Sequence, residues 1–93
     1  MHVEHNREAH RFYIEVPGGT AELAYQEMGE GILDLVSTYV PPAARGQGLA
    51  GRLVEAAMAH ARAEGLRIIP SCWYVADWLR SHPEAADLLA EIG

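Results

Sequence analysis

The first half of the chain carries the hydrophobic and polar patterns of three β-strands joined by short turns. Residues 11–16 are rich in strand-favouring side chains and stop at a Pro-Gly-Gly cluster, which is typical of a turn. Residues 20–28 alternate between apolar and polar side chains, as a half-buried strand does. A Gly-Glu-Gly turn then leads into a third apolar run at residues 32–40. Because short turns join antiparallel neighbours, this pattern predicts an antiparallel meander.

The pattern changes to a helical period in the second half. Between Gly46 and about Glu64 the apolar side chains recur at spacings of four, one, three, one and three residues, with charged side chains opposite. This predicts one amphipathic helix of roughly four to five turns. Residues 66–71 are predicted as a short strand, which the crossover places parallel to the third strand. Residues 74–81 and 83–92 are predicted as terminal helices.

These elements predict a single α/β domain with a mixed sheet. Three antiparallel strands are followed by a crossover helix, a fourth strand parallel to the third, and terminal helices packed on one side. We expect the domain to span residues 10–93 and the polar residues 1–9 to form a flexible tail. A chain of 93 residues is too short for a multidomain enzyme but long enough to bury one core without a metal or a disulfide.

The charge balance restricts the partners that the protein could bind. Seven basic residues stand against thirteen acidic ones, for a net charge of −6, and the chain contains no lysine. An acidic chain is a poor partner for nucleic acid, whose binding needs many cations to displace phosphate counterions. Without lysine, a Walker-type phosphate loop and Schiff-base chemistry are also excluded. The acidic surface instead favours a cationic small molecule or a basic peptide.

Cysteine usage and hydropathy bear on the compartment. Cys72 is the one cysteine, so the chain cannot form an intramolecular disulfide, which fits a reducing compartment. The first ten residues do not resemble a secretory signal, and no apolar run approaches the length of a membrane span. We therefore expect a cytoplasmic protein that neither spans a membrane nor binds nucleic acid; the sequence leaves its oligomeric state open.

A glycine-rich segment lies between the third strand and the long helix. A helix N-terminus presents unpaired N–H groups and a partial positive charge, which suit phosphate oxygens. A side chain at Gly46 or Gly48 would hold the backbone away from an anion, and Arg45 adds a full charge nearby. The alternative is that the glycines only give a tight entry into the helix. Three glycines in six residues are costly there, since each loses roughly 1 kcal/mol against alanine, and this favours phosphate binding.

The same hexapeptide, residues 46–51, also satisfies the G-x-G-x-x-G dinucleotide fingerprint. That fingerprint expects its glycines directly after a strand, whereas five residues intervene here. It also expects an acidic residue about 20 positions further on, where this chain has Ser71 and Cys72. A dinucleotide fold further needs more parallel strands than the chain can supply. The dinucleotide interpretation is therefore disfavoured.

Residues 40–50 resemble the acetyl-CoA signature of the GNAT superfamily of N-acetyltransferases, R-x-x-G-x-G/A, with Arg45, Gly48 and Ala50 at the matching positions. The likeness to a short single-domain branch extends over roughly residues 10–90, including residues 70–75 and 78–84. It implies an acetyl-CoA cosubstrate whose pyrophosphate lies on the amides at the helix start. It also implies that the pantetheine arm runs between the third strand and the strand ending near Cys72. The cofactor-binding residues implied are Val40, Arg45, Gly46, Gln47, Gly48, Leu49, Ala50 and Gly51.

Acetyl transfer to an amine needs an unprotonated acceptor, a donor to the developing oxyanion and a proton for the departing thiolate. Backbone amides of residues 36–40 could polarise the carbonyl. Cys72 could act as nucleophile or acid, or could be a small buried apolar residue. His82 could be a general base or could cap a helix junction. Tyr74 could donate its phenol to the thiolate or could belong to the core.

The sequence thus predicts an N-acetyltransferase that uses acetyl-CoA and acts on an unidentified amine. One alternative is an acyl-CoA-binding or sensing module without turnover, because the predicted elements lack the N-terminal helices with which larger GNAT enzymes recognise acceptors. Another is a small interaction domain that binds a partner through an edge strand. His2, His5 and His10 are loosely spaced in the predicted tail, so no metal site is predicted. His60 is expected to be a solvated residue of the long helix.

Overall fold

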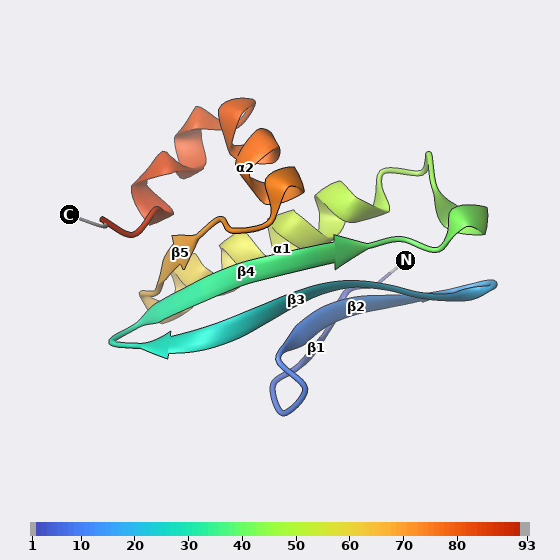
Figure 1. The fold of residues 1–93 in the computed structure, drawn as a ribbon, viewed down its shortest axis with the longest axis horizontal. Coiled ribbons are helices and arrows are strands. Elements are labelled where there is room, and N and C mark those ends of the chain that lie inside the picture. The colour runs from blue at the N-terminus through green and yellow to red at the C-terminus, as the bar shows by residue number, and fades with distance from the viewer. Residues whose placement is uncertain (1, 92–93) are drawn as a thin grey trace.

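A five-stranded mixed sheet forms the centre of the protein in a computed structural model, which describes residues 2–91 (Figure 1). The strands lie in the order β1-β2-β3-β4-β5; β1 to β4 pair antiparallel with their neighbours, and β5 pairs parallel to β4. This arrangement confirms the predicted α/β fold class, the meander and the parallel crossover. The strands are β1 (Glu4–Asn6), β2 (Arg11–Val16), β3 (Gly19–Gly29), β4 (Ile32–Tyr39) and β5 (Arg67–Ile69).

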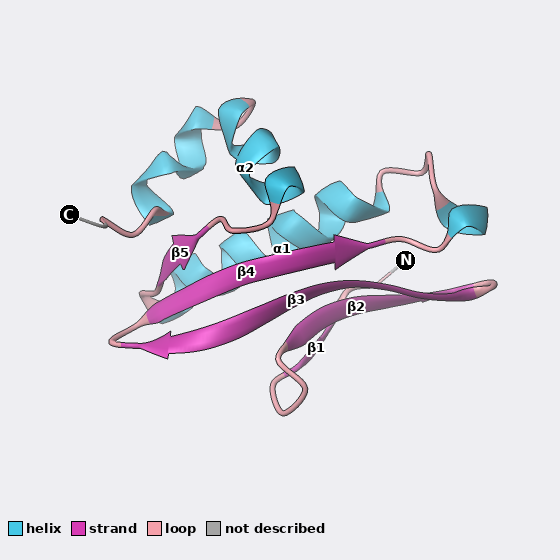
Figure 2. Cartoon of the chain, viewed as in Figure 1, coloured by secondary structure: helices cyan, strands magenta, loops and turns pink. Residues whose placement is uncertain are grey.

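Two α-helices and two short 3-10 helices complete the fold (Figure 2). They are η1 (Pro42–Ala44), α1 (Leu49–Glu64), α2 (Trp73–Arg80) and η2 (Pro83–Leu88). Helix α1 packs against β2 and β3 through side chains such as Leu53, Val54 and Ala57, which are fully buried. The predicted helix started at Gly46, whereas α1 starts at Leu49. The difference arises because Gly46 and Gly48 adopt left-handed conformations, with φ of 83° and 75°, that a right-handed helix cannot contain.

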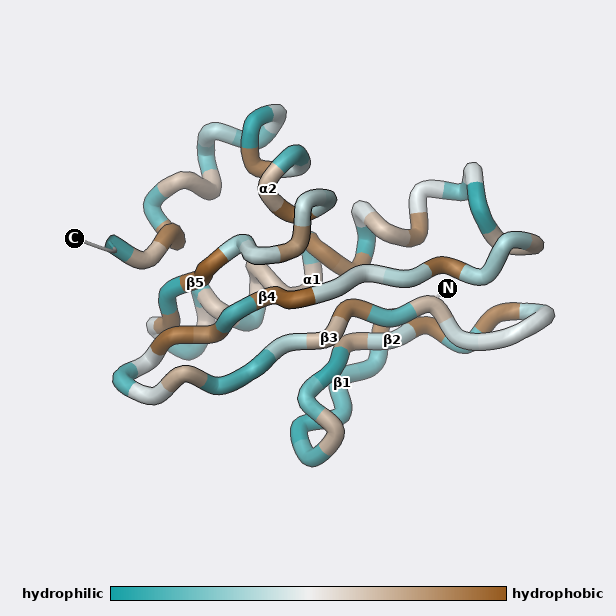
Figure 3. Tube along the Cα trace, viewed as in Figure 1, coloured by the Kyte–Doolittle hydropathy of each residue, from teal (hydrophilic) through white to brown (hydrophobic). Residues whose placement is uncertain are grey.

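The N-terminal segment differs from the prediction of a flexible tail over residues 1–9. Residues 4–6 form strand β1, which pairs with β2 from Glu4↔Tyr13 to Asn6↔Arg11. This region is hydrophilic (Figure 3), so it gives no alternating signal from which a strand could be predicted. Its order comes from tertiary contacts instead: the His5 ring stacks on Phe12 with centroids 4.1 Å apart, and its Nε2 is 2.7 Å from the Tyr25 hydroxyl.

The C-terminal segment also differs from its prediction. A helix was expected over residues 83–92, but the 3-10 helix η2 ends at Leu88 and the chain then becomes extended. Leu89 bridges to Ile68 of β5, and the Ala90 amide donates to the Ile68 carbonyl at 2.8 Å. This pairing satisfies a backbone acceptor at the sheet edge and so overrides the local helical preference. Ile92 lies outside the described residues.

Strand β5 pairs along its whole length with only the first three residues of β4, and β4 extends beyond it. Their parallel pairing ends at Asp34↔Ile69, and three residues after Ile69 the Cys72 amide donates to the Leu35 carbonyl at 2.8 Å. The chain then leaves the sheet into α2, while β4 continues to Tyr39. A register shift against β3 leaves Val36 as an extra residue between the pairs Tyr25↔Leu35 and Ala24↔Ser37. Strand β4 therefore carries a bulge at Val36, just beyond the residues that pair with β5.

Candidate functional site

The glycine loop connects β4 to α1 and opens onto the helix N-terminus. η1 folds the loop through amide donation from Ala44 to the Pro41 carbonyl at 2.9 Å. The Arg45 Nε donates to the Val40 carbonyl at 2.9 Å, which ties the two ends of the loop together. Gly48 is the N-cap of α1, and no side chain caps the helix there. The first amides of α1 therefore remain available to an external acceptor.

Gly46 and Gly48 leave open space where side chains would stand. A Cβ atom built on either residue meets no heavy atom within 4 Å. Space is therefore not what restricts these two positions to glycine. The backbone conformation is, because other residues rarely adopt such positive φ angles. The loop is exposed from Arg45 to Gly48. An exposed turn with bare backbone at the positive end of a 16-residue helix has the features that an anion site requires.

The side chain of Tyr74 lies against the start of α1, next to Gly51. A Cβ built on Gly51, in the first turn of α1, would lie 3.6 Å from the Tyr74 hydroxyl oxygen. At that distance an alanine methyl group would make an ordinary van der Waals contact with the phenol. The phenol therefore lies beside the first turn of α1.

Cys72 lies at the N-cap of α2 with only 6% of its surface exposed. Its sulfur is 3.4 Å from the Thr38 hydroxyl oxygen, and its amide is bonded to Leu35. The thiol thus faces the part of β4 that extends beyond the β5 pairing. Sequence analysis did not single out Thr38, because its 34-residue separation from Cys72 is bridged only in the folded chain.

His82 lies at the other end of α2 from Cys72. Its ring stacks on Trp78 with centroids 3.7 Å apart and planes inclined by 6°, and Nδ1 is 2.8 Å from the Trp78 carbonyl oxygen. It also occupies the N-cap of η2. These contacts fit the alternative in which His82 fixes the helix junction; a role as general base stays a prediction.

A second group of ionisable side chains lies at the C-terminal end of α1. The rings of His5 and His60 meet edge to face with centroids 4.6 Å apart, and His60 also contacts Phe12. Burial lowers the pKa of both imidazoles, and their mutual repulsion and Arg7 act in the same direction on His5. His60 is therefore half-buried among aromatic rings, contrary to the expectation that it is a solvated helix residue. The periodicity of α1 could not reveal this, because β1 supplies the covering side chain.

The two histidines predict a loss of stability in mild acid. A lowered pKa means that the unfolded chain binds more protons than the folded one below the ordinary imidazole pKa of about 6.5. Their neutral-state stabilisation is complete above that pH and is lost as the pH falls through the pKa of the folded protein. We expect the free energy of unfolding, measured by urea denaturation, to fall between about pH 7.5 and 5.5.

The variant His60→Gln should flatten this pH dependence, because one of the two titrating groups is removed. The exposed His2, whose ring lies 3.2 Å from Glu4, provides the control, and His2→Gln should leave the slope unchanged. An equal slope in the wild type and in His60→Gln would show that the pair does not set the acid sensitivity.

Comparisons with known proteins agree with this geometry. A family model described as GCN5-related N-acetyl-transferase matches residues 11–88. Protein NATD1 from Bos taurus is 36% identical over 85 residues, which cover 89% of this chain and 75% of that protein. NATD1 from Homo sapiens is 35% identical over 85 residues, with the same coverage of both chains. A solution structure of a GCN5-like protein from Staphylococcus aureus superposes with a TM-score of 0.77, covering 99% of this chain and 90% of that one. At 24% identity, that last match bears on the fold alone.

Proposed function

Because the chain belongs to the GCN5-related N-acetyltransferase family, we propose that it transfers the acetyl group of acetyl-CoA to an amine. The observation that supports acetyl-CoA as the cosubstrate is the N-terminus of α1. No side chain caps it, and Gly46 and Gly48, both in left-handed conformations, precede it. The amides of Gly46 to Gly51 would hold the pyrophosphate, with the charge of Arg45 beside them. Bound acetyl-CoA supplies a thioester, whose acyl carbon is open to attack by an amine.

Strand β4 extends beyond its last pair with β5, and we propose that the pantetheine arm lies along this extension. Beyond Asp34 the backbone of β4 has no β5 partner within the described residues, and Val40 adjoins the glycine loop. Backbone groups at such an edge can pair with the amide groups of an extended ligand. The bulge at Val36 changes the direction of the backbone, as bulges next to active sites commonly do. Its amide is our candidate for the donor that polarises the acyl carbonyl.

Cys72 and Tyr74 are the side chains proposed to act at the thioester. In one form of the mechanism the amine attacks the acyl carbon, the C–S bond to CoA breaks, and the Cys72 thiol or the Tyr74 phenol gives its proton to the departing thiolate. The thiolate or phenolate so formed then takes the proton that the amide nitrogen loses. In the other, the Cys72 sulfur attacks the acyl carbon and its proton leaves with CoA as the free thiol. The amine then attacks the acetyl-cysteine thioester, and the released Cys72 thiolate takes the proton that the amide nitrogen loses. The phenol lies beside the first turn of α1 and the thiol beside Thr38, so both flank the proposed path of the arm.

Thr38 is proposed as a positioning residue for Cys72. Thr38→Val keeps the shape but removes the hydroxyl 3.4 Å from the sulfur, and we expect turnover to fall by about three- to tenfold, the size of one hydrogen bond. Thr38→Ser keeps the hydroxyl and should retain most of the activity. The measurement is the rate of CoA release at saturating acetyl-CoA. Full turnover in Thr38→Val with a loss in Thr38→Ser would instead indicate that the methyl group, not the hydroxyl, matters.

The proposed activity is tested by release of CoA thiol from acetyl-CoA in the presence of a panel of amines, with mass spectrometry of the products. The net charge of −6 favours cationic amines and basic peptides in that panel. An enzyme gives amine-dependent CoA release and an acetylated product. Binding of acetyl-CoA without release under any amine would instead support a sensing module. No binding at millimolar acetyl-CoA would leave the interaction domain as the remaining alternative.

A further inference from the structure

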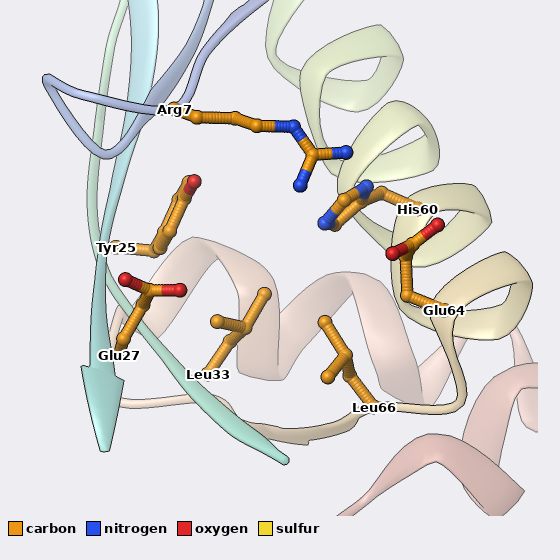
Figure 4. A pocket seen from close by; sticks show the side chains of 7 residues that line it. All are labelled: Arg7, Tyr25, Glu27, Leu33, His60, Glu64 and Leu66. Atoms are coloured by element: carbon orange, nitrogen blue, oxygen red, sulfur yellow. The ribbon is translucent and has the colours of Figure 1, made fainter. Parts of the chain in front are cut away.

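A cavity of about 230 Å³ lies at the C-terminal end of α1, far from the glycine loop. His60 and Gly48 are 12 residues apart on α1, or about 18 Å along a helix. The cavity lies between the last turns of α1, strand β3 and the turn that joins β1 to β2 (Figure 4). A water molecule takes up about 30 Å³, so a molecule the size of an amino acid can enter. The acetyl-transfer proposal makes no use of this space.

Two opposite charges border the cavity. The guanidinium of Arg7 reaches over it toward the ring of His60, and the carboxylate of Glu64 lies on the far side of that ring (Figure 4). Within residues 2–91 neither Arg7 nor Glu64 takes part in an ion pair. Glu27, the other acid in the lining, lies 3.2 Å from His10. The lining therefore carries one cation, Arg7, and two carboxylates, Glu27 and Glu64, all on exposed residues, and within residues 2–91 Arg7 and Glu64 have no ion-pair partner.

Besides these charged groups, His60 and Tyr25, the lining consists of two leucines that are shared with a smaller cavity. Leu33 and Leu66 form the base of the first cavity (Figure 4). A neighbouring cavity of about 160 Å³ shares both leucines and is also lined by Ile32. An apolar group placed over the leucines thus has room to extend into the second cavity, where contact with these side chains would stabilise it.

We propose that this cavity binds a zwitterionic α-amino acid with an apolar side chain. Arg7 receives the carboxylate, Glu64 receives the ammonium group, and the side chain lies over Leu33 and Leu66. A simple carboxylate would leave Glu64 without a counter-ion, and a simple amine would leave Arg7 without one. The assignment does not depend on acetyl transfer, because it rests on residues at the opposite end of α1.

The test compares three probes on the full chain without CoA, using amide chemical shifts in an NMR titration. The probes are L-leucine, 4-methylpentanoate, which lacks the ammonium group, and isoamylamine, which lacks the carboxylate. We expect leucine to shift the amides of Tyr25, His60 and Leu66 saturably. Each single-charge analogue should bind at least about tenfold more weakly, because it loses one charge-assisted contact.

Two variants assign the charges, and a third provides the control. Arg7→Gln and Glu64→Gln should each weaken leucine binding about tenfold. Glu55→Gln, at an exposed position of α1 outside the cavity lining, should leave it unchanged. The proposal is overturned if leucine gives no saturable shift at these amides up to its solubility limit. It is also overturned if an analogue binds as well as leucine, or if neither charge variant weakens binding.

Discussion

Replacing Gly48 with alanine is expected to weaken CoA binding by about 10- to 100-fold. The new methyl group would stand in the open space over the helix N-terminus, where the proposed pyrophosphate lies. Hydrogen bonds to a charged group contribute about 1.5–3 kcal/mol each, and 1.4 kcal/mol corresponds to a tenfold change in affinity. Calorimetry with CoA measures the change directly.

Gly65 provides a matched control for backbone strain. It caps the other end of α1 with φ of 69°, and a Cβ there also meets nothing within 4 Å. Alanine in a left-handed conformation costs about 1–2 kcal/mol at either position, so Gly48→Ala and Gly65→Ala should lose similar thermal stability. Only Gly48→Ala should lose CoA affinity. If both variants bind CoA as the wild type does, the proposed role of the glycine loop is wrong.

Replacing Cys72 with alanine is expected to lower turnover by about 100-fold, the lower end of what a positioned proton donor or nucleophile contributes. CoA affinity should change little, because the proposed pyrophosphate site lies at the other end of the arm. Steady-state rates with the best acceptor amine and calorimetry with CoA separate the two effects. Unchanged turnover would remove Cys72 from the mechanism.

Two further measurements distinguish chemistry from packing at Cys72. Val75 is fully buried in the same helix, so Val75→Ala should destabilise the fold without touching the thiol. At a temperature where this variant stays folded, we expect it to keep most of its turnover. Mass spectrometry of the wild type with acetyl-CoA alone then assigns the role of the thiol. An added acetyl group on Cys72 identifies a nucleophile, and an unmodified chain combined with a loss of turnover in Cys72→Ala favours an acid.

The elements that could be predicted from the sequence are those that depend on residues close together in the chain. Helix α1 follows from its period of apolar side chains, and the loop at Gly46 and Gly48 follows from a short fixed spacing. The approach of Tyr74 to Gly51 was not predicted, because no local pattern encodes a contact between residues 23 positions apart.

The features that sequence analysis missed depend on distant partners. Strand β1 is polar, and it is held by pairing with β2 and by contacts of His5 with Phe12 and Tyr25. His60 is half-buried only because His5, 55 positions earlier, lies against it. The C-terminal segment becomes extended because Ile68 offers a sheet edge. Propensity and periodicity act over a few residues, so neither can report such contacts.

No helix among residues 2–91 combines the length and the apolar character needed to cross a membrane.

The central claim is that the first amides of α1 hold the diphosphate of CoA, and an NMR titration tests it most directly. CoA is compared with pantetheine, which has the same arm but no diphosphate. We expect CoA to produce its largest amide shifts at residues 46–51 and pantetheine to leave these amides almost unshifted. Shifts concentrated elsewhere, equal shifts from pantetheine, or no shift at millimolar CoA would contradict the claim.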